Sequence, residues 1–117
     1  MKEQNVKEYR PWGYYSVIEQ GSGFIVKIIH VNKGHRLSLQ SHNHRSEHWV
    51  VLSGVADVVL NDIKCTLKVG QSVDIPLKAH HSLQNPYEAD LEVLEIQMGK
   101  ILSEDDIIRY EDIYGRV

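Results

Sequence analysis

The stretch LQSHNHRSEHW at residues 39–49 gathers side chains that bind metal ions and transfer protons. It holds three of the seven histidines of the chain, together with a glutamine, a glutamate and an arginine. Imidazole nitrogens and carboxylate oxygens are ligands for divalent metals, and histidine also titrates near neutral pH. The stretch therefore predicts a metal or acid–base site, provided that enough of these side chains share one face.

The alternation of side chains along a β-strand selects among these residues. Gln40 and His42 lie two positions apart, so on one strand they project from the same face. Residues 43–46 are polar and are expected to connect to a strand that starts at Glu47. His81 follows a proline-led turn farther along the chain. Two imidazoles, a carboxylate and an amide oxygen that converge inside a barrel can hold one divalent ion and leave a position for substrate.

Short strands separated by turns must position these residues. β-branched and apolar segments alternate with turns that contain glycine or asparagine, and the expected strands are residues 14–18, 24–32, 36–42, 48–52, 55–60, 63–67, 72–75, 81–84 and 91–98. Such a series indicates an antiparallel sandwich or barrel. Ser103 followed by Asp106 resembles a helix N-cap, so a short helix is expected near residues 103–109. The expected fold class is all-β with a short C-terminal helix.

Composition indicates one globular domain. The 117 residues are 42% hydrophobic and 25% charged, which suits a chain that closes a single core. We expect a polar N-terminal arm over residues 1–9 and a single domain over residues 10–117. The net charge of −3, with scattered basic residues, gives no footprint for nucleic acid or an anionic membrane.

The sequence also favours a cytoplasmic location. Cys65 is the only cysteine, so no disulfide can form within the chain, which suits a reducing compartment. The charged N-terminus lacks the apolar segment of a signal peptide. No apolar run approaches the roughly 20 residues that span a bilayer.

Two motifs resemble those of the cupins. The matching residues are Gly34, Gln40, His42, Glu47 and Gly54 in the first motif, and Gly70, Pro76, His81 and Asn85 in the second. Gln40 stands where most cupins have histidine, and Lys78 stands where glycine is usual. The resemblance implies a double-stranded β-helix, or jelly-roll barrel, and places His44, His48 and His80 outside the ligand set. The implied metal ligands are Gln40, His42, Glu47 and His81.

The resemblance extends to one family over residues 10–117. The segments RPWG, LSLQSHNHRSEHWVVLSG, SVDIP, LEIQMG and SEDDIIRYEDIYGRV resemble the type II mannose-6-phosphate isomerase domain in order and spacing. That domain usually forms the C-terminal part of bifunctional mannose-1-phosphate guanylyltransferase/mannose-6-phosphate isomerases. The chain departs from the family at residues 33–35 and 101–103, neither of which contains an implied ligand. Because the eight glycines include no nucleotide-binding loop, the resemblance implies the isomerase activity alone.

The implied reaction interconverts mannose 6-phosphate and fructose 6-phosphate through an enediolate. One divalent ion, by resemblance Zn²⁺, stabilises the negative charge that develops. Arg45, His44 and His48 are the candidate catalytic residues, with the histidines as proton carriers and Arg45 as a clamp for the phosphate or the enediolate. By alternation His48 points away from the face of Glu47, so an outer-face or interface position is an equally good interpretation.

Further residues are candidates for substrate binding at the mouth of the barrel. These candidates are Arg45, Lys78, His80, Trp12 and Arg10. Arg109 and Arg116 are weaker phosphate candidates, and for Arg109 a salt bridge within the acidic tail is the favoured interpretation.

Other functions stay open at this point. The chain could be a non-catalytic sugar-phosphate-binding cupin, another metal-dependent cupin enzyme, a cupin that has lost its metal, or a structural subunit that pairs with a separate guanylyltransferase. Gln40 argues against a dioxygenase, since cupin dioxygenases more often use three histidines and a glutamate. A homodimer is expected because cupins of this type commonly dimerise.

Overall fold

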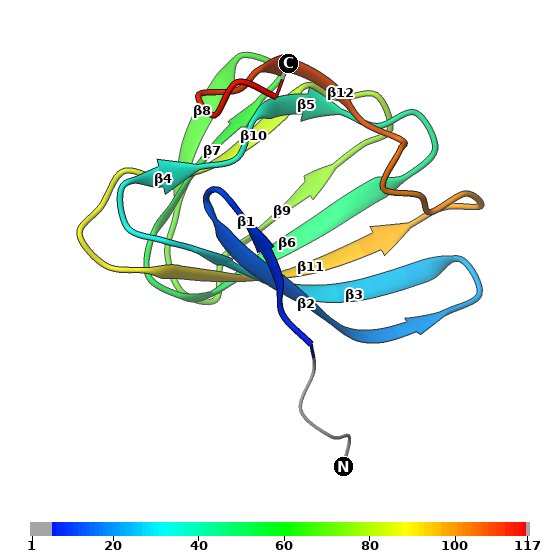
Figure 1. The fold of residues 1–117 in the computed structure, drawn as a ribbon, viewed down its shortest axis with the longest axis horizontal. Coiled ribbons are helices and arrows are strands. Elements are labelled where there is room, and N and C mark those ends of the chain that lie inside the picture. Colours follow the sequence, from blue (N-terminus) through cyan, green and yellow to red (C-terminus); the bar gives the residue numbers. More distant parts are fainter. Residues whose placement is uncertain (1–5, 117) are drawn as a thin grey trace.

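Two antiparallel sheets face each other and form the walls of a barrel (Figure 1). The structure is a computed structural model, and it describes residues 6–116. The first sheet contains β1 (Glu8–Arg10), β2 (Gly13–Gly21), β3 (Phe24–Val31), β11 (Leu91–Met98), β6 (Ser46–Ser53) and β9 (Ser72–Ile75), in that order. The second contains β12 (Ile108–Glu111), β5 (Leu39–Ser41), β10 (His81–Asn85), β7 (Ala56–Leu60) and β8 (Ile63–Leu67), and β4 (His35–Arg36) also pairs with β10.

The interior of the barrel changes from apolar to polar along its length. Leu91 and Val93 of β11 are fully buried and pair with β3 at Val31 and Ile29. Two residues farther along β11, the inward residue is Glu95, and its partner on β3 is a lysine. Because inward side chains recur every second residue, this switch places the polar residues of several strands at the same end. That end of the barrel holds the residues implied as metal ligands.

Most of the predicted strands form, with ends that differ by at most three residues, but the predicted strand 36–42 divides into β4 and β5, and β1 and β12 were not expected. The hairpin predicted at Asn61-Asp62 joins β7 to β8, with Leu60 opposite Ile63. Asn61 and Asp62 have positive φ angles of 47° and 69°, the conformation that a tight two-residue hairpin needs. All-β architecture is confirmed.

The predicted helix near residues 103–109 is wrong. The described part of the chain, residues 6–116, contains no helix. Ser103 instead caps a turn: its Oγ accepts from Asp105 N at 3.1 Å, and its carbonyl accepts from Asp106 N at 3.1 Å. The chain then extends into β12, which pairs with β5. A serine turn and a helix N-cap share the same local signals, and here pairing with the sheet decides between them.

The N-terminal region is partly built into the fold. Residues 1–5 of the predicted arm lie outside the described residues, whereas β1 pairs with β2 at Tyr9↔Tyr14. The division into an arm and one domain stays a prediction.

No helix in the described part is long and apolar enough to cross a membrane.

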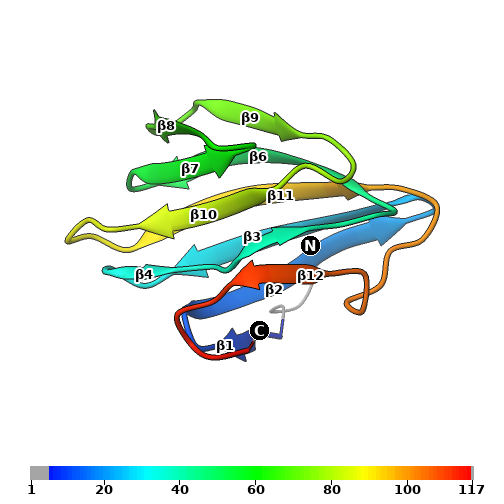
Figure 2. The same ribbon diagram turned by 90° about the horizontal axis from the view of Figure 1, so that it is seen from above.

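Segment 99–107 carries the chain from the first sheet to the second, between the end of β11 and the start of β12 (Figure 2). It thereby brings acidic tail residues to the polar end of the barrel, where Glu104 bonds Lys27 and Asp106 bonds the main chain after β5.

Candidate metal centre

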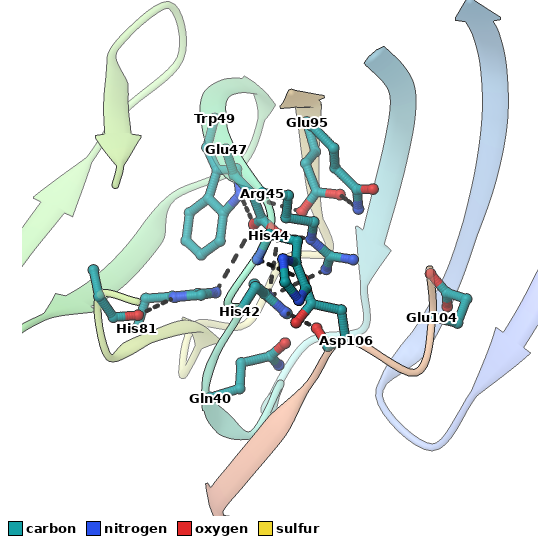
Figure 3. Close-up of polar contacts among 12 residues, drawn as sticks. Gln40, His42, His44, Arg45, Glu47, Trp49, His81, Glu95, Glu104 and Asp106 are labelled. Carbon is teal, nitrogen blue, oxygen red and sulfur yellow. Dashed lines mark hydrogen bonds and ion pairs between the residues drawn. The ribbon is translucent and has the colours of Figure 1, made fainter. Parts of the chain in front are cut away.

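Three buried side chains from different parts of the chain converge at the polar end of the barrel. His42 follows β5, Glu47 lies on β6 and His81 begins β10. Their potential ligand atoms all lie within 4.8 Å of one another (Figure 3). Glu47 Oε2 is 3.2 Å from His42 Nε2, and Glu47 Oε1 is 3.9 Å from His81 Nε2. Two imidazoles and a carboxylate at this spacing fit a divalent transition-metal ion.

Main-chain acceptors orient both imidazoles toward the same point. His42 Nδ1 donates to the Asp106 carbonyl at 2.7 Å, and His81 Nδ1 donates to the Ala79 carbonyl at 2.9 Å. A proton held on Nδ1 leaves the Nε2 lone pair free to bind a metal. Burial lowers the pKa of His42 to about 4, with Arg45 adding to the effect, and burial also lowers the pKa of His81. Both imidazoles are therefore neutral at pH 7, which is the form that binds metal.

Gln40 lies beside this trio. It is the direct cross-strand partner of His81, and its side chain lines the same cavity as Glu47 and His81. Its amide Nε2 donates to Ser38 Oγ at 3.0 Å. Because the nitrogen is held by serine, the amide oxygen remains available as a ligand.

Arg45 contacts two of the potential ligand atoms. Its Nε donates to Glu47 Oε2 at 2.8 Å, and its Nη2 donates to His42 Nε2 at 3.1 Å. A bound metal would require the same atoms, so the guanidinium and a metal compete for them. Arg45 therefore lies directly against two of the three side chains that could hold a metal, Glu47 and His42.

Asp106 anchors the loop that presents His42. Its carboxylate accepts from the main-chain N–H groups of Asn43 and His44, each at 2.9 Å, and its carbonyl accepts from His42. Burial acts to raise the pKa of Asp106, but the two main-chain donors outweigh it, so that this pKa is lowered. The tail thus fixes the loop that follows β5.

The cavity above the trio contains charged groups beyond the implied ligands. Glu95 is buried and accepts hydrogen bonds from Trp49 Nε1 at 3.2 Å and Gln97 Nε2 at 2.7 Å. Burial raises its pKa to about 7, and the nearby Glu47 carboxylate adds to the shift. Lys27 points inward from β3 and donates to Glu104 Oε2 at 3.1 Å. The cavity can therefore bind a charged, polar ligand.

Of the candidates at the mouth, Arg10 and Trp12 line the cavity. Lys78 and His80 are exposed and are not among the lining residues. His80 stacks on Tyr110 with ring centroids 4.1 Å apart. Lys78 has a φ of 66°, a left-handed conformation that explains why glycine is usual at this position.

The two histidines proposed as proton carriers lie apart from the trio. His44 is exposed, and only its main-chain N–H is held, by Asp106. His48 donates from Nδ1 to Asp74 Oδ1 at 2.6 Å, across the pair formed by β6 and β9. His48 thus occupies the outer face that the alternation predicted. Neither histidine is among the residues that line the cavity.

Sequence reasoning missed several residues of the cavity. Lys27 lies within the apolar run FIVKIIHV, and Glu95 and Gln97 lie within LEVLEIQM. A charged or amide residue at an inward position of an apolar strand is the signal that would have revealed them, because burying such a group requires partners. For Asp106 the sequence signals indicate only a place in the predicted helix cap.

The two-sheet barrel and its buried histidine–carboxylate trio define the class of the protein, which is a cupin with the double-stranded β-helix fold. The structure is similar to that of an uncharacterised conserved protein with a double-stranded β-helix domain from Klebsiella pneumoniae subsp. pneumoniae. The TM-score is 0.77 at 19% sequence identity, and the match covers 92% of each chain. At this identity the likeness shows the fold alone.

Within the cupins, the chain belongs to the family of the mannose-6-phosphate isomerase C-terminal domain, which matches residues 1–112. It is 52% identical over 110 residues to the xanthan biosynthesis protein XanB of Xanthomonas campestris pv. campestris, and this covers 94% of the chain and 24% of XanB. It is 48% identical over 109 residues to the mannose-1-phosphate guanylyltransferase ManC of Salmonella typhimurium, with coverage of 93% and 23%. The chain thus spans about a quarter of the length of these relatives. The predicted family is confirmed.

Proposed function

We propose that the protein is a metal-dependent isomerase that interconverts mannose 6-phosphate and fructose 6-phosphate through an enediolate. The observation that carries the proposal is the convergence of His42, Glu47 and His81 in a chain of this family, with Glu47 and His81 lining a charged cavity. An aldose–ketose isomerase needs fixed positive charge next to the carbon atoms that exchange a proton, and a cavity to bind the sugar. The barrel offers side chains that could hold a metal ion as the source of positive charge, and a cavity that could bind the sugar.

We propose Gln40, His42, Glu47 and His81 as the ligands of one Zn²⁺ ion. When bound, the ion supplies the positive charge that stabilises the developing oxyanion. The chain prepares the site by holding both imidazoles with their Nδ1 protons on main-chain carbonyls. It also keeps the Gln40 nitrogen on Ser38. Such outer contacts fix the ligand orientation before any ion arrives.

Arg45 and Glu95 are the proposed catalytic residues inside the cavity. Arg45 lies against Glu47 and His42, so its guanidinium is placed to stabilise negative charge at the reacting end of the sugar. Glu95 lines the cavity, and its described hydrogen-bond donors are the neutral side chains of Trp49 and Gln97. We propose it as the proton carrier, in preference to His44 and His48.

The partners proposed are a second copy of the chain and a guanylyltransferase. On the outer face of the first sheet, the apolar pairs Leu94↔Ile28 and Ile96↔Val26 are only partly buried. An antiparallel sheet face in water usually carries polar residues, so this face supports a homodimer, which mass measurement in solution tests.

The guanylyltransferase partner is supported by the relative ManC, which is named as a mannose-1-phosphate guanylyltransferase. The single exposed Cys65 suits the cytoplasm, the location we propose.

The test is direct turnover. The metal-loaded chain is incubated with mannose 6-phosphate, and fructose 6-phosphate is measured with zinc, manganese, cobalt or nickel, before and after chelation. We expect product that chelation abolishes and added metal restores. No product with any of these ions would refute the isomerase and favour a non-catalytic sugar-phosphate-binding cupin. The Glu95→Gln variant is expected to lose turnover but to keep its metal, which separates proton transfer from metal binding.

A further inference from the structure

Arg109 differs from the other basic side chains of the cavity because its described surroundings contain no partner for it. Its Nε is the only buried side-chain nitrogen or oxygen within residues 6–116 that lacks a hydrogen bond. The salt bridge expected for it in the acidic tail does not form with any described residue. A buried donor without a partner destabilises a fold, so its presence calls for a ligand.

The remaining cavity cations are already engaged. The basic side chains that line the cavity are Arg10, Lys27, Arg45, Arg109 and Arg116. Lys27 donates to Glu104, and Arg10 donates to Tyr9 O and Tyr15 Oη. Arg116 donates from Nε and Nη2 to both oxygens of Asp112. Arg45 donates to the potential metal ligands. Only Arg109 keeps a full set of guanidinium donors for an incoming anion.

The register of the second sheet places Arg109 at a defined distance from the metal centre. His81 on β10 pairs with Gln40 on β5, and Gln40 pairs with Arg109 on β12. Residues directly opposite each other project from the same face, and all three line the cavity. His81, Gln40 and Arg109 therefore form a row across the sheet, with the backbones of the outer two about 10 Å apart.

We propose that Arg109 binds the phosphate group of the substrate, at the opposite end of the row from His81. This assignment rests on the proposed function, and it names the anion subsite of the same cavity. A hexose 6-phosphate carries its reacting carbons at one end and its phosphate at the other. The row from His81 to Arg109 has the same order, with the proposed metal ligand at the end for the reacting carbons and the free guanidinium at the end for the phosphate. The planar guanidinium can donate two parallel hydrogen bonds to a phosphate monoester. Arg45, which lies at the metal centre, then serves the reacting end.

The experiment compares Arg109→Gln with a matched control, Arg36→Gln. Arg36 is an arginine on β4 whose partner is Glu111 at 3.6 Å, and it does not line this cavity. Inorganic phosphate and mannose 6-phosphate are titrated into the metal-free chain, with the fluorescence of the buried, cavity-lining Trp12 as one signal and calorimetry as another. We expect Arg109→Gln to bind both about 10- to 100-fold more weakly, and Arg36→Gln to match the wild type. Turnover of mannose 6-phosphate relative to mannose should fall by the same factor in Arg109→Gln.

Stability distinguishes a ligand-binding role from a structural one. Because Arg109 has no partner to lose, Arg109→Gln is expected to keep or raise the melting temperature of the free chain, while the stabilisation by added phosphate is lost. A drop in melting temperature together with unchanged phosphate binding would overturn the subsite. Arg109→Lys keeps the charge without the paired donors, so its phosphate affinity should fall between those of the wild type and Arg109→Gln.

The outcomes separate this proposal from the proposed function. If the wild type isomerises the sugar and Arg109→Gln keeps both phosphate affinity and substrate preference, the subsite is refuted and the isomerase stands. If the wild type does not turn over but binds inorganic phosphate through Arg109, the subsite stands and the isomerase is refuted. The subsite would also be refuted if the wild type, Arg109→Gln and Arg109→Lys all bound phosphate with the same affinity.

Discussion

The two ends of the cavity are organised in opposite ways. At the metal end, both imidazoles, the glutamate and the neighbouring arginine all have hydrogen-bond partners. At the β12 end, the Arg109 guanidinium has no partner among the described residues. The side chains of the first end are already hydrogen-bonded to one another or to main-chain carbonyls, whereas the second end keeps a guanidinium with free donors. In the proposed function, the ordered end would hold the metal ion and the free donors would bind the exchanging substrate.

Removing a ligand should disrupt the metal end most strongly. His81→Ala deletes an imidazole of the buried trio, and we expect the affinity for zinc to fall by more than about 100-fold, beyond what outer contacts contribute. Competition with a chromogenic chelator measures this affinity. His80→Ala is the matched control, since His80 is exposed and stacks on Tyr110. Equal zinc affinity in the two variants would rule out His81 as a ligand.

A smaller loss should follow when only the support of the metal end is removed. Asp106→Ala deletes the carboxylate that accepts from Asn43 and His44, so the loop that presents His42 loosens. We expect zinc affinity to fall by about 10- to 100-fold, as measured by the same chelator competition. Asp105→Ala is the control, because its exposed side chain has no recorded contact with that loop. Equal zinc affinity in the Asp106→Ala and Asp105→Ala variants would show that the Asp106 carboxylate does not support the metal site through the loop that presents His42.

Arg116, unlike Arg109, has an acidic partner in the tail, and the stability that this pair provides should depend on pH. Hydrogen bonds from Arg116 lower the pKa of Asp112, so this pair stabilises the fold above the unfolded pKa of about 3.9 and ceases to do so as pH falls through the lower folded value. Asp112→Asn should therefore lower the free energy of unfolding by about 1 to 2 kcal/mol at pH 7, and by much less near pH 2. Urea denaturation at both pH values measures this difference. A loss of equal size at both would contradict the ion pair.

The smallest effect concerns backbone strain near the metal end. Lys78 holds a φ of 66° in the turn before His81, a conformation that is unfavourable for a residue with a Cβ. Lys78→Gly should raise the free energy of unfolding by about 0.5 to 1 kcal/mol, since relief of strain exceeds the added chain entropy. Lys78→Ala keeps the Cβ and should show no such gain in thermal or urea unfolding. A gain in both variants would point to the lysine charge instead.

Much of the metal end could be predicted from the sequence because its signals are local. Gln40 and His42 are two residues apart, and the period of a strand alone puts them on one face. The cupin spacing then adds Glu47 and His81, and the structure brings His42, Glu47 and His81 together. The outward position of His48 followed from the same alternation.

The β12 end could not be predicted, because its signals are not local. Ser103 favours a turn or a helix equally well, and only pairing with β5 makes residues 108–111 a strand. The lack of a partner for Arg109 depends on which acidic residues reach it, and Asp112 pairs with Arg116 instead. A tail rich in acidic residues therefore suggested a salt bridge that the tertiary structure does not form.

The late position of β12 in the chain has a consequence for the timing of folding. The pairing of Gln40 with Arg109 and the hydrogen bond from His42 to the Asp106 carbonyl can form only after the tail has been made. The strands of the first sheet are already complete once β11 has been made. During synthesis, β12 and the segment before it are made after β11. We therefore expect an interval in which the first sheet can close but the site is not yet complete, so that completion of the site follows formation of the barrel.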